Sequence, residues 1–415
     1  MQRIIVHIDF DSFFASVAQQ YNPALRNKPL GVTATNGRTC IIAASREAKK
    51  YGIKSPSITY EAKQLCPDIV FIPADFVQYW EVSKKFISIC KDFSPYVEVF
   101  SIDELFIDVT LTTHLFGGVA GIVAKIKERI RLEIGEYISA SFGISHNKLL
   151  AKLASGLEKP NGVVYIRPDD VESVYAKAKL TDICGIGNRV ARRLYKIGVY
   201  TLLDLKHISL YTLIAEFGKV EGQFLKSIGL GMDNSIIIPY TQAPEVKSIS
   251  RNYCLARNEY NKTVVMQNVF ELCEEVGIKL RRLGKKAKTV GIYLGGDTNI
   301  HGQKTIGFVD SGKEIFEGCL SILRANGVSR ETGGDYARQI HVGASGLVDA
   351  DTTPLSLFDM QGKKERLQSV VDTLNERFGD HTIRNAFLLY ADKLTTVPNG
   401  FMADRYERFL LSSRA

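Results

Sequence analysis

The sequence places three carboxylates at the ends of strand-like segments. Asp9 closes the apolar run 3–9, and the pair Asp103 and Glu104 lies between two further strand-like runs. Converging carboxylates repel one another unless a hard cation is present, and Mg²⁺ prefers oxygen ligands while leaving part of its shell to substrate phosphates. Two such ions would activate an attacking hydroxyl and stabilise the leaving oxygen of a phosphoryl transfer. Taken singly, each acid would more often be a solvated turn residue, since most acids lie at the surface.

The order of the elements predicts that these acids meet. In sequence we expect a strand at 3–9, a helix from the N-cap Ser12 to Gln20, an insertion at 25–78, a helix from Tyr79, strands at 97–101 and 105–109, a helix from Val119 to Ile130 and a strand at 138–144. This is an elaborated split β-α-β layer, in which the end of the first strand and the turn between the next two are neighbours. The three acids would then share one exposed edge.

A second layer follows a helical region. Residues 167–232 carry short helical patterns broken by glycines, and Pro239 and Pro244 interrupt a stretch without periodicity that predicts a linker. Strand and helix patterns then repeat the β-α-β-β-α-β order, with strands near 247–253, 290–294, 305–309 and 336–346 and helices near 262–283 and 313–325. Beyond 346 one further helix is predicted from apolar residues at helical spacing between Leu367 and Phe378.

Composition narrows the class of protein. The chain has 415 residues, 45% of them hydrophobic, with 53 Lys+Arg against 45 Asp+Glu and a net charge of +8. That balance excludes a disordered or fibrous chain and indicates two to four domains. No apolar run approaches the ~20 residues of a membrane span, and the N-terminus lacks a signal-peptide pattern, so we expect a cytoplasmic protein. The seven cysteines are scattered and never form C-x-x-C, which argues against a disulfide framework or a thiolate zinc site.

Three motifs, in register, carry a resemblance to a known family. They are the stretch from Asp9 to Val17 (DFDSFFASV), the tetrapeptide from Ser101 to Glu104 (SIDE), and the stretch from Ser145 to Ser155 (SHNKLLAKLAS) that runs on to Lys159-Pro160-Asn161-Gly162. In order and spacing the chain resembles a Y-family (translesion) DNA polymerase of the bacterial DNA polymerase IV or UmuC-like type, over about residues 1–346.

The resemblance implies an α+β, right-hand polymerase. It would have a ferredoxin-like palm, small fingers, a helical thumb with a helix–hairpin–helix, and a separate βαββαβ little finger. The implied boundaries are palm 1–24 and 79–166, fingers 25–78, thumb 167–232, linker 233–245, little finger 246–346 and a C-terminal tail 347–415.

The resemblance also assigns roles around the carboxylates. Asp9, Asp103 and Glu104 would be catalytic and would hold two Mg²⁺ ions together with the carbonyl of Phe10, while Asp11 supports the site. Phe14 would be the steric gate against a ribose 2′-OH, although core packing is the ordinary fate of a phenylalanine. The implied nucleotide-binding residues are Phe13, Phe14, Arg46, Lys49 and Lys159. Arg46 and Lys49 depart from the family's Tyr and Arg, and a lysine lacks the planar fork of an arginine.

Basic and glycine-containing segments are candidate DNA contacts. Gly185 and Gly187 would form the hairpin, and the alternative is a simple turn between helices. The candidate cations are Arg189 and Arg192 behind the hairpin, and Lys247, Arg251, Arg281 and Lys285 in the second layer, where a solvated basic turn is the competing interpretation. Leu355, Leu357 and Phe358 resemble a peptide that binds the sliding clamp, with Pro354 in place of the usual Gln.

The sequence therefore predicts a template-directed, low-fidelity DNA polymerase that adds deoxynucleotides to a primer 3′-hydroxyl by two-metal catalysis, in translesion synthesis and DNA repair. Its expected partners are primer–template DNA, dNTP and, as a candidate, the sliding clamp; we expect a monomer and no membrane. One alternative is a noncatalytic, polymerase-like DNA-binding accessory protein of lesion bypass. Another is a different two-metal enzyme on a ferredoxin-like palm, such as a cyclase, which needs neither hairpin nor basic second layer.

Overall fold

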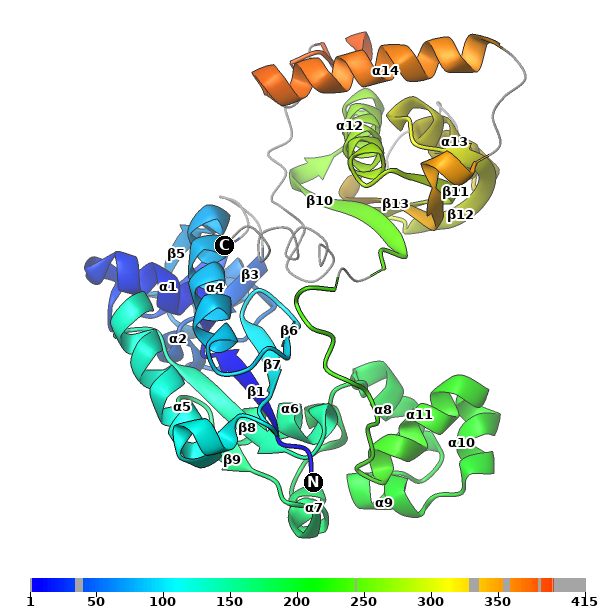
Figure 1. Ribbon diagram of the computed structural model, residues 1–415. Helices are drawn as coiled ribbons and strands as arrows, with labels where there is room; N and C mark the ends of the chain where they lie inside the picture. The colour runs from blue at the N-terminus through cyan, green and yellow to red at the C-terminus, as the bar shows by residue number, and fades with distance from the viewer. Residues whose placement is uncertain are drawn as a thin grey trace. The chain divides into compact units, whose positions relative to one another are not determined.

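A computed structural model describes residues 2–33, 40–242, 245–327, 336–353, 359–379, 382–389 and 391. Contacts divide these residues into two compact units, one formed by residues 2–33 and 40–242 and the other by residues 245–391 (Figure 1). Across these ranges no helix combines the length and the apolar character that crossing a membrane requires.

The first unit is built on a five-stranded sheet with strand order β6-β7-β1-β8-β9 (Figure 1). Its strands are β1 (Ile5–Phe10), β6 (Val97–Val99), β7 (Glu104–Asp108), β8 (Ala140–Ser145) and β9 (Val163–Tyr165). β1 lies at the centre and pairs antiparallel with both β7 and β8. The helices around it are α1 (Phe13–Tyr21), α4 (Phe76–Lys91), α5 (Gly118–Arg129) and α6 (Lys148–Leu157).

β1 is covered on both faces, which explains its almost continuous apolar sequence. Phe10 packs against α4, whereas Ile5 shares a buried cluster with Ala151 of α6. Successive side chains of a strand alternate between faces. The two polar residues of the strand, His7 and Asp9, therefore lie on the α6 face together with Ile5.

Helix α6 approaches the sheet closely because Gly143 of β8 has no side chain. A Cβ atom at this position would lie 2.0 Å from the carbonyl oxygen of Ala151 and 2.3 Å from the amide nitrogen of Ser155. The helix begins at a strong N-cap, since the Asn147 side chain accepts from the amide of Leu150 at 2.9 Å. Strand and cap together fix the axial position of α6.

A smaller four-stranded sheet is inserted between α1 and α4. Its order is β4-β3-β2-β5, with β2 (Leu30–Thr33), β3 (Cys40–Ala44), β4 (Ser57–Ile58) and β5 (Val70–Pro73), and it carries the short helices α2 (Arg46–Lys49) and α3 (Thr59–Leu65). Ser12 occupies the N-cap position of α1, as predicted, but its side chain does not cap the helix. It has a left-handed φ of 51°, and its hydroxyl accepts from Lys49 Nζ at 2.8 Å.

A helical region completes the first unit. It contains α7 (Val171–Tyr175), α8 (Asn188–Lys196), α9 (Leu202–His207), α10 (Leu210–Phe217) and α11 (Lys219–Gly229). Its core is continuous with the leucines of α6, and the amide of Leu149 donates to Asp233 at 3.1 Å. Beyond it, residues 233–242 run without helix or strand along β6, where the amide of Tyr240 donates to the carbonyl of Val97 at 2.8 Å.

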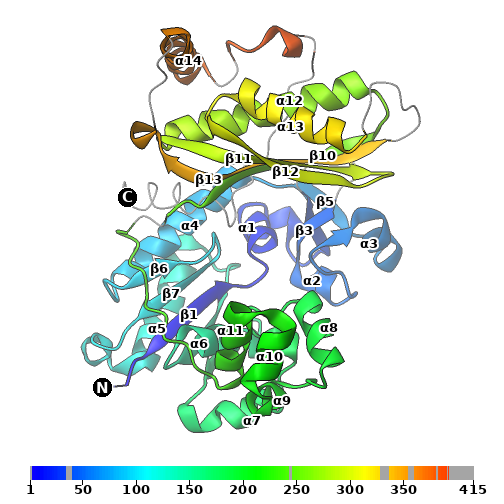
Figure 2. The same cartoon turned by 90° about the vertical axis from the view of Figure 1, so that its right-hand side faces the viewer.

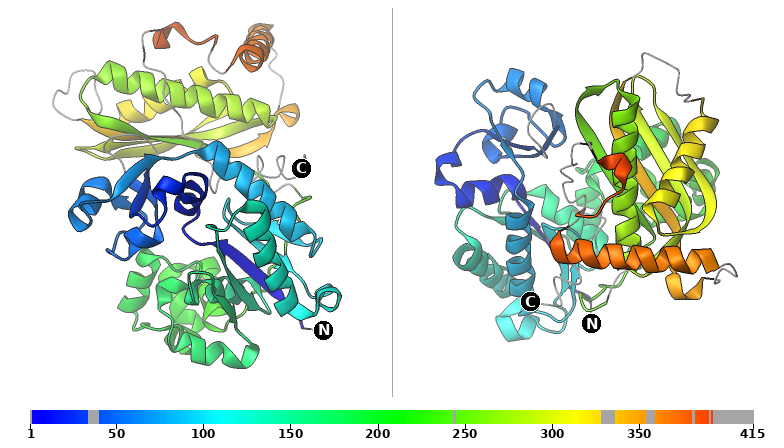
Figure 3. Two further views of the ribbon diagram at one scale, coloured as in Figure 1. Left: turned by 90° about the vertical axis from the view of Figure 1, so that its left-hand side faces the viewer. Right: turned by 90° about the horizontal axis from the view of Figure 1, so that it is seen from above.

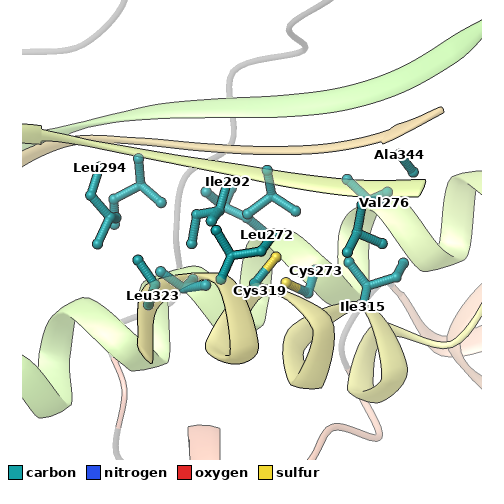
Figure 4. Packing of buried hydrophobic residues seen from close by; sticks show 14 of the residues in the cluster. Leu272, Cys273, Val276, Ile292, Leu294, Ile315, Cys319, Leu323 and Ala344 are labelled. Atoms are coloured by element: carbon teal, nitrogen blue, oxygen red, sulfur yellow. The ribbon is translucent and has the colours of Figure 1, made fainter. Parts of the chain in front are cut away.

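The second unit is a four-stranded antiparallel sheet covered by helices on one face (Figure 2). The strand order is β10-β13-β11-β12, with β10 (Ser248–Glu259), β11 (Lys285–Gly296), β12 (Ile300–Val309) and β13 (Ala337–Asp349), and the helices are α12 (Lys262–Arg282) and α13 (Gly312–Ala325). Figure 4 shows the core between the helices and the sheet, where Cys273 of α12 and Cys319 of α13 are both fully buried as free thiols. The predicted β-α-β-β-α-β order is confirmed here.

Helix α14 (Asp359–Phe378) lies on the helical side of the second unit (Figure 3). Its polar residues face the unit: Asp372 forms an ion pair with Arg281, and Glu365 forms one with Lys286 at 2.9 Å. Leu367 and Phe378 on the other face are 66% and 63% exposed. Ion pairs therefore link the helix to the unit, while part of its apolar stripe is exposed.

Candidate active site

The pairing of β1 with β7 brings the three predicted carboxylates together. Asp9 is the cross-strand partner of Glu104, and the amide of Phe10 donates to the carbonyl of Asp103 at 3.0 Å. The acids come from segments almost a hundred residues apart in sequence. Antiparallel register alone places them at one end of the sheet.

One oxygen of each carboxylate is held by a neighbouring side chain. Lys159 Nζ lies 2.5 Å from Asp9 Oδ1, and the hydroxyl of Ser101 donates to Asp103 Oδ1. Glu104 Oε2 contacts His7 Nε2 at 2.9 Å and also accepts from the ammonium of Lys152. The site thus consists of three carboxylates, two of which are in contact with a lysine ammonium group.

The electrostatics differ among the three carboxylates. Burial raises the pKa of Asp9 above its usual range against the opposing charge of Lys159, and burial likewise raises the pKa of Asp103. Burial would also raise the pKa of Glu104, but the hydrogen bond from His7 and the charge of Lys152 lower it to about 2. Burial lowers the pKa of His7 itself, which favours the neutral ring. Repulsion from Asp103 adds to the raised pKa of Asp9, and repulsion from Glu104 adds to the raised pKa of Asp103, so a cation at this edge would be stabilised.

The donor set suits a hard divalent cation. Carboxylate oxygens are the ligands that Mg²⁺ prefers, and Mg²⁺ sites commonly use one or two carboxylates with substrate phosphates rather than a complete protein cage. Among the described residues, no group of three or more His, Cys, Asp or Glu side chains is already placed to hold a metal ion. The second oxygens of Asp9 and Glu104 accept no hydrogen bond within the described ranges, and they remain available to a cation.

Asp11 is buried and organises the loop that carries Lys159. Its carboxylate accepts from Ser139 Oγ at 2.6 Å, from Ser141 Oγ at 2.8 Å and from the amide of Asn161 at 2.8 Å. Three donors therefore hold this acid, so it serves as a structural anchor rather than as a free ligand. Neither serine was identified from the sequence, where both are inconspicuous strand residues.

Two cations of the small sheet face the same acids. Lys49 donates to Ser12, and Arg46 Nη2 donates to Ser139 Oγ at 2.5 Å. Burial lowers the pKa of Lys49, and repulsion from Lys159 adds to that effect. Lys49 is thus near Lys159, and Arg46 binds the serine that donates to Asp11.

Phe14 is packed as part of an aromatic group at the start of α1. Its ring stacks on Tyr79 with centroids 4.4 Å apart, and Phe13 stacks on Phe10 at 5.2 Å. Burial raises the pKa of Tyr79 to about 12, so that this ring stays neutral. Sequence reasoning identified Phe13 and Phe14 but missed Tyr79, whose only signal was a place on the apolar stripe of α4.

The predicted hairpin lies at the start of α8. Gly185 has a φ of 102°, which a residue with a side chain rarely adopts, and Gly187 is the N-cap of α8. Arg189 and Arg192 are exposed on this helix. Arg189 and Arg192 are three residues apart on α8 and so share one side of that helix, while the role of the hairpin in DNA binding stays a prediction.

The predicted cations of the second unit are mostly engaged within it. Lys247 is exposed, but Arg251 Nε lies 2.9 Å from Glu275 and Lys285 Nζ lies 2.6 Å from Asp349. Arg281 binds both carboxylate oxygens of Asp372 and the carbonyl of Asp310. The candidate clamp residues Leu355, Leu357 and Phe358 lie outside the described residues.

Comparison with known proteins supports the family. Residues 8–156 match the impB/mucB/samB family model, and residues 246–357 match the model of that family's C-terminal domain. The chain is 33% identical to a DNA polymerase IV of Pelotomaculum thermopropionicum over 93% of its own length and 95% of that protein. It is 32% identical to a DNA polymerase IV of Dehalococcoides mccartyi over 92% of its length and 96% of that protein.

The fold agrees with a solved structure as well. A Y-family DNA polymerase chimera superposes with a TM-score of 0.70 at 24% identity, covering 83% of this chain and 99% of that one. The right-hand α+β architecture expected from the sequence is thereby confirmed. From its two matched models, its curated relatives and its fold, the chain belongs to the Y family of DNA-directed DNA polymerases.

Proposed function

We propose that this chain extends a DNA primer across damaged templates by two-metal nucleotidyl transfer. The observation that carries the proposal is the pairing of β1 with β7, where Asp9, Asp103 and Glu104 meet beside two cations, which are Lys159 and Lys152. Members of the family whose acids are lost could bind DNA without catalysis, whereas here all three carboxylates are present. The accessory-protein alternative is therefore the less favoured one.

The acids and the Phe10 carbonyl would hold two Mg²⁺ ions. When bound, such ions supply activation of the primer hydroxyl and charge stabilisation of the leaving oxygen. Asp9 presents an unoccupied oxygen for this purpose, and Glu104 presents another. Lys159 shields Asp9 at 2.5 Å, so a triphosphate that attracts Lys159 would also release Asp9 for the cation.

The neighbouring cations would bind the triphosphate. Lys159, Lys49 and Arg46 come from two different segments and converge near the acids. Arg46 offers a planar fork, whereas the two lysines act as point charges. Phe14, held by its stack on Tyr79, would lie under the sugar and exclude a 2′-hydroxyl.

We propose that the parts of the fold correspond to the subdomains of a right-hand polymerase. We assign palm to 1–24 and 79–166, fingers to 25–78, thumb to 167–232, linker to 233–245, little finger to 246–346 and a tail to 347–415. Arg189 and Arg192 beside the hairpin, together with Lys247, would contact DNA phosphates, which position a duplex without reading its sequence. The fingers at 25–78 are small, and low-fidelity synthesis is the activity that the family resemblance implies for this chain.

Primer extension tests the proposal. Wild-type chain, Asp103→Asn and the exposed control Asp92→Asn are supplied with a labelled primer–template, Mg²⁺ and dNTPs. Because cation binding contributes several kcal/mol to the transition state, Asp103→Asn should lower the extension rate by ~100-fold or more while DNA affinity is retained. Absence of extension by the wild-type chain, with DNA binding intact, would leave the accessory-protein alternative in its place.

A further inference from the structure

His7 is a fully buried polar residue that the roles assigned so far do not use. It lies two residues before Asp9 on β1 and therefore on the same face of the sheet. Its Nε2 contacts Glu104 Oε2 at 2.9 Å and its Nδ1 contacts Ser155 Oγ at 2.7 Å. Its ring also packs on Phe106, with centroids 4.5 Å apart. Both nitrogens and one face of the ring are thus engaged.

The hydrogen bonds specify one tautomer. A carboxylate only accepts, so His7 Nε2 must carry the proton that faces Glu104. In the neutral ring Nδ1 is then an acceptor. The Ser155 hydroxyl has one hydrogen and lies near two acceptors, His7 Nδ1 at 2.7 Å and the carbonyl oxygen of Lys152 at 2.9 Å, so in this form of the ring its hydrogen must point to Nδ1. Without that donor the ring could take the other tautomer, which would set two acceptors against each other. A Ser155 hydroxyl that points to Nδ1 therefore stabilises the form of His7 that binds Glu104.

The arrangement acts on one oxygen of Glu104. Both His7 and Lys152 bind Oε2, and Oε1 has no hydrogen-bond partner among the residues described. The ammonium group of Lys152 lies at the end of a flexible four-carbon side chain, whereas the His7 side chain is a rigid ring held between a strand and a helix. The rotation of the carboxylate is therefore set by His7, in such a way that Oε1 is left for another ligand.

We infer that His7 and Ser155 form a positioning pair that orients Glu104 toward a divalent cation. The inference rests on the proposed function, because it takes Glu104 to be a metal ligand. Gly143 is the cross-strand neighbour of His7, and its missing side chain lets α6 bring Ser155 to the ring. Partners that fix a metal ligand typically change metal affinity by ~10–100-fold when they are removed.

Mn²⁺ binding to the full-length chain, followed by electron paramagnetic resonance in the presence of primer–template DNA, tests this directly. His7→Phe keeps a ring against Phe106 but removes the donor, and we expect the Mn²⁺ dissociation constant to rise ~10-fold or more. His7→Gln places an amide donor near the original Nε2 and should stay within a few-fold of wild type. Ser155→Ala should weaken binding, and adding it to His7→Phe should have no further effect.

Ser83→Ala is the matched control, since it deletes a buried hydroxyl that has no hydrogen-bond partner among the described residues. A purely structural role for His7 predicts a lower melting temperature with unchanged Mn²⁺ affinity, and that result overturns the inference. If His7→Phe does not fold, His7→Gln and Ser155→Ala decide the question. Wild-type chain that binds Mn²⁺ but extends no primer refutes the proposed function. Unchanged Mn²⁺ affinity in His7→Phe beside normal wild-type extension refutes the positioning pair alone.

Discussion

Replacing Gly143 with alanine should displace the helix that carries Lys152 and Ser155. The new Cβ would lie 2.0 Å from the carbonyl oxygen of Ala151 and 2.3 Å from the amide nitrogen of Ser155. Ordinary van der Waals contact begins near 3.4 Å, so the helix backbone must retreat by more than 1 Å. Overpacking of this kind costs about 1–3 kcal/mol, and a backbone clash belongs at the upper end.

That energy converts into two measurable changes. For a unit of this size ~3 kcal/mol lowers the melting temperature by roughly 6–12 °C. A displacement of ~1 Å in the groups that position a reaction lowers its rate by ~100-fold. Gly143→Ala should therefore have a lower melting temperature and a lower rate of primer extension than wild type. The extension rate should be lower even at temperatures where the variant is still folded.

Gly156→Ala is the matched control on the same helix. It lies in the last turn of α6, and a Cβ there meets no atom within 4 Å. Alanine in a helix is favoured over glycine by about 0.5–1 kcal/mol, so this variant should melt slightly higher than wild type and keep its activity. If Gly143→Ala keeps the melting temperature and the extension rate of wild type, the close packing of α6 on β8 is refuted.

Three further outcomes are expected. Phe14→Ala should raise the ratio of ribonucleotide to deoxynucleotide incorporation by ~10–100-fold, since it removes a packing clash of about 1–3 kcal/mol; an unchanged ratio in single-nucleotide extension would exclude the gate. Asp372→Ala removes the charged partner of Arg281, a loss of about 1–3 kcal/mol, and should speed hydrogen exchange across 359–378; unchanged exchange would show that the ion pair does not hold α14. Burial, with the charge of Asp310, raises the pKa of Glu314 above its ordinary 4.5, so the folded state gains stability as pH falls. Glu314→Gln should accordingly melt higher than wild type at pH 8 and lose that advantage toward pH 5; a constant difference across the range would contradict the shift.

The sequence predicted the sheets well because burial leaves a clear periodicity. The run 3–9 anticipated β1, and the motif Ser101–Glu104 lies where β7 begins. The α6 contacts could not be predicted, because they depend on how closely a helix approaches a sheet. His7 gave only the weak signal of a polar residue in an apolar strand, and its partners are 97 and 148 residues away.

The tertiary contacts of the linker and of the charged residues were harder to predict from the sequence. The pattern at residues 233–245 predicted a linker. Its apolar triplet 236–238 gave little indication that Ile237 would be buried against β1 and α6. The basic run 281–288 predicted a candidate DNA-binding surface. Sequence periodicity cannot predict ion-pair partners that lie far along the chain. Charge is assigned by residue type, whereas its availability depends on tertiary contacts.

The ion pairs of the second unit bear on how DNA binding would respond to salt. Arg281, Arg282, Lys285 and Lys286 each pair with a carboxylate of the same unit, respectively Asp372, Glu376, Asp349 and Glu365. A cation displaces condensed counterions from DNA only when it neutralises a phosphate. Cations already neutralised by an internal acid must first exchange one anionic partner for another, so they release fewer counterions than their number suggests. The ionic-strength dependence of binding should therefore reflect the unpaired cations rather than the formal charge of the run.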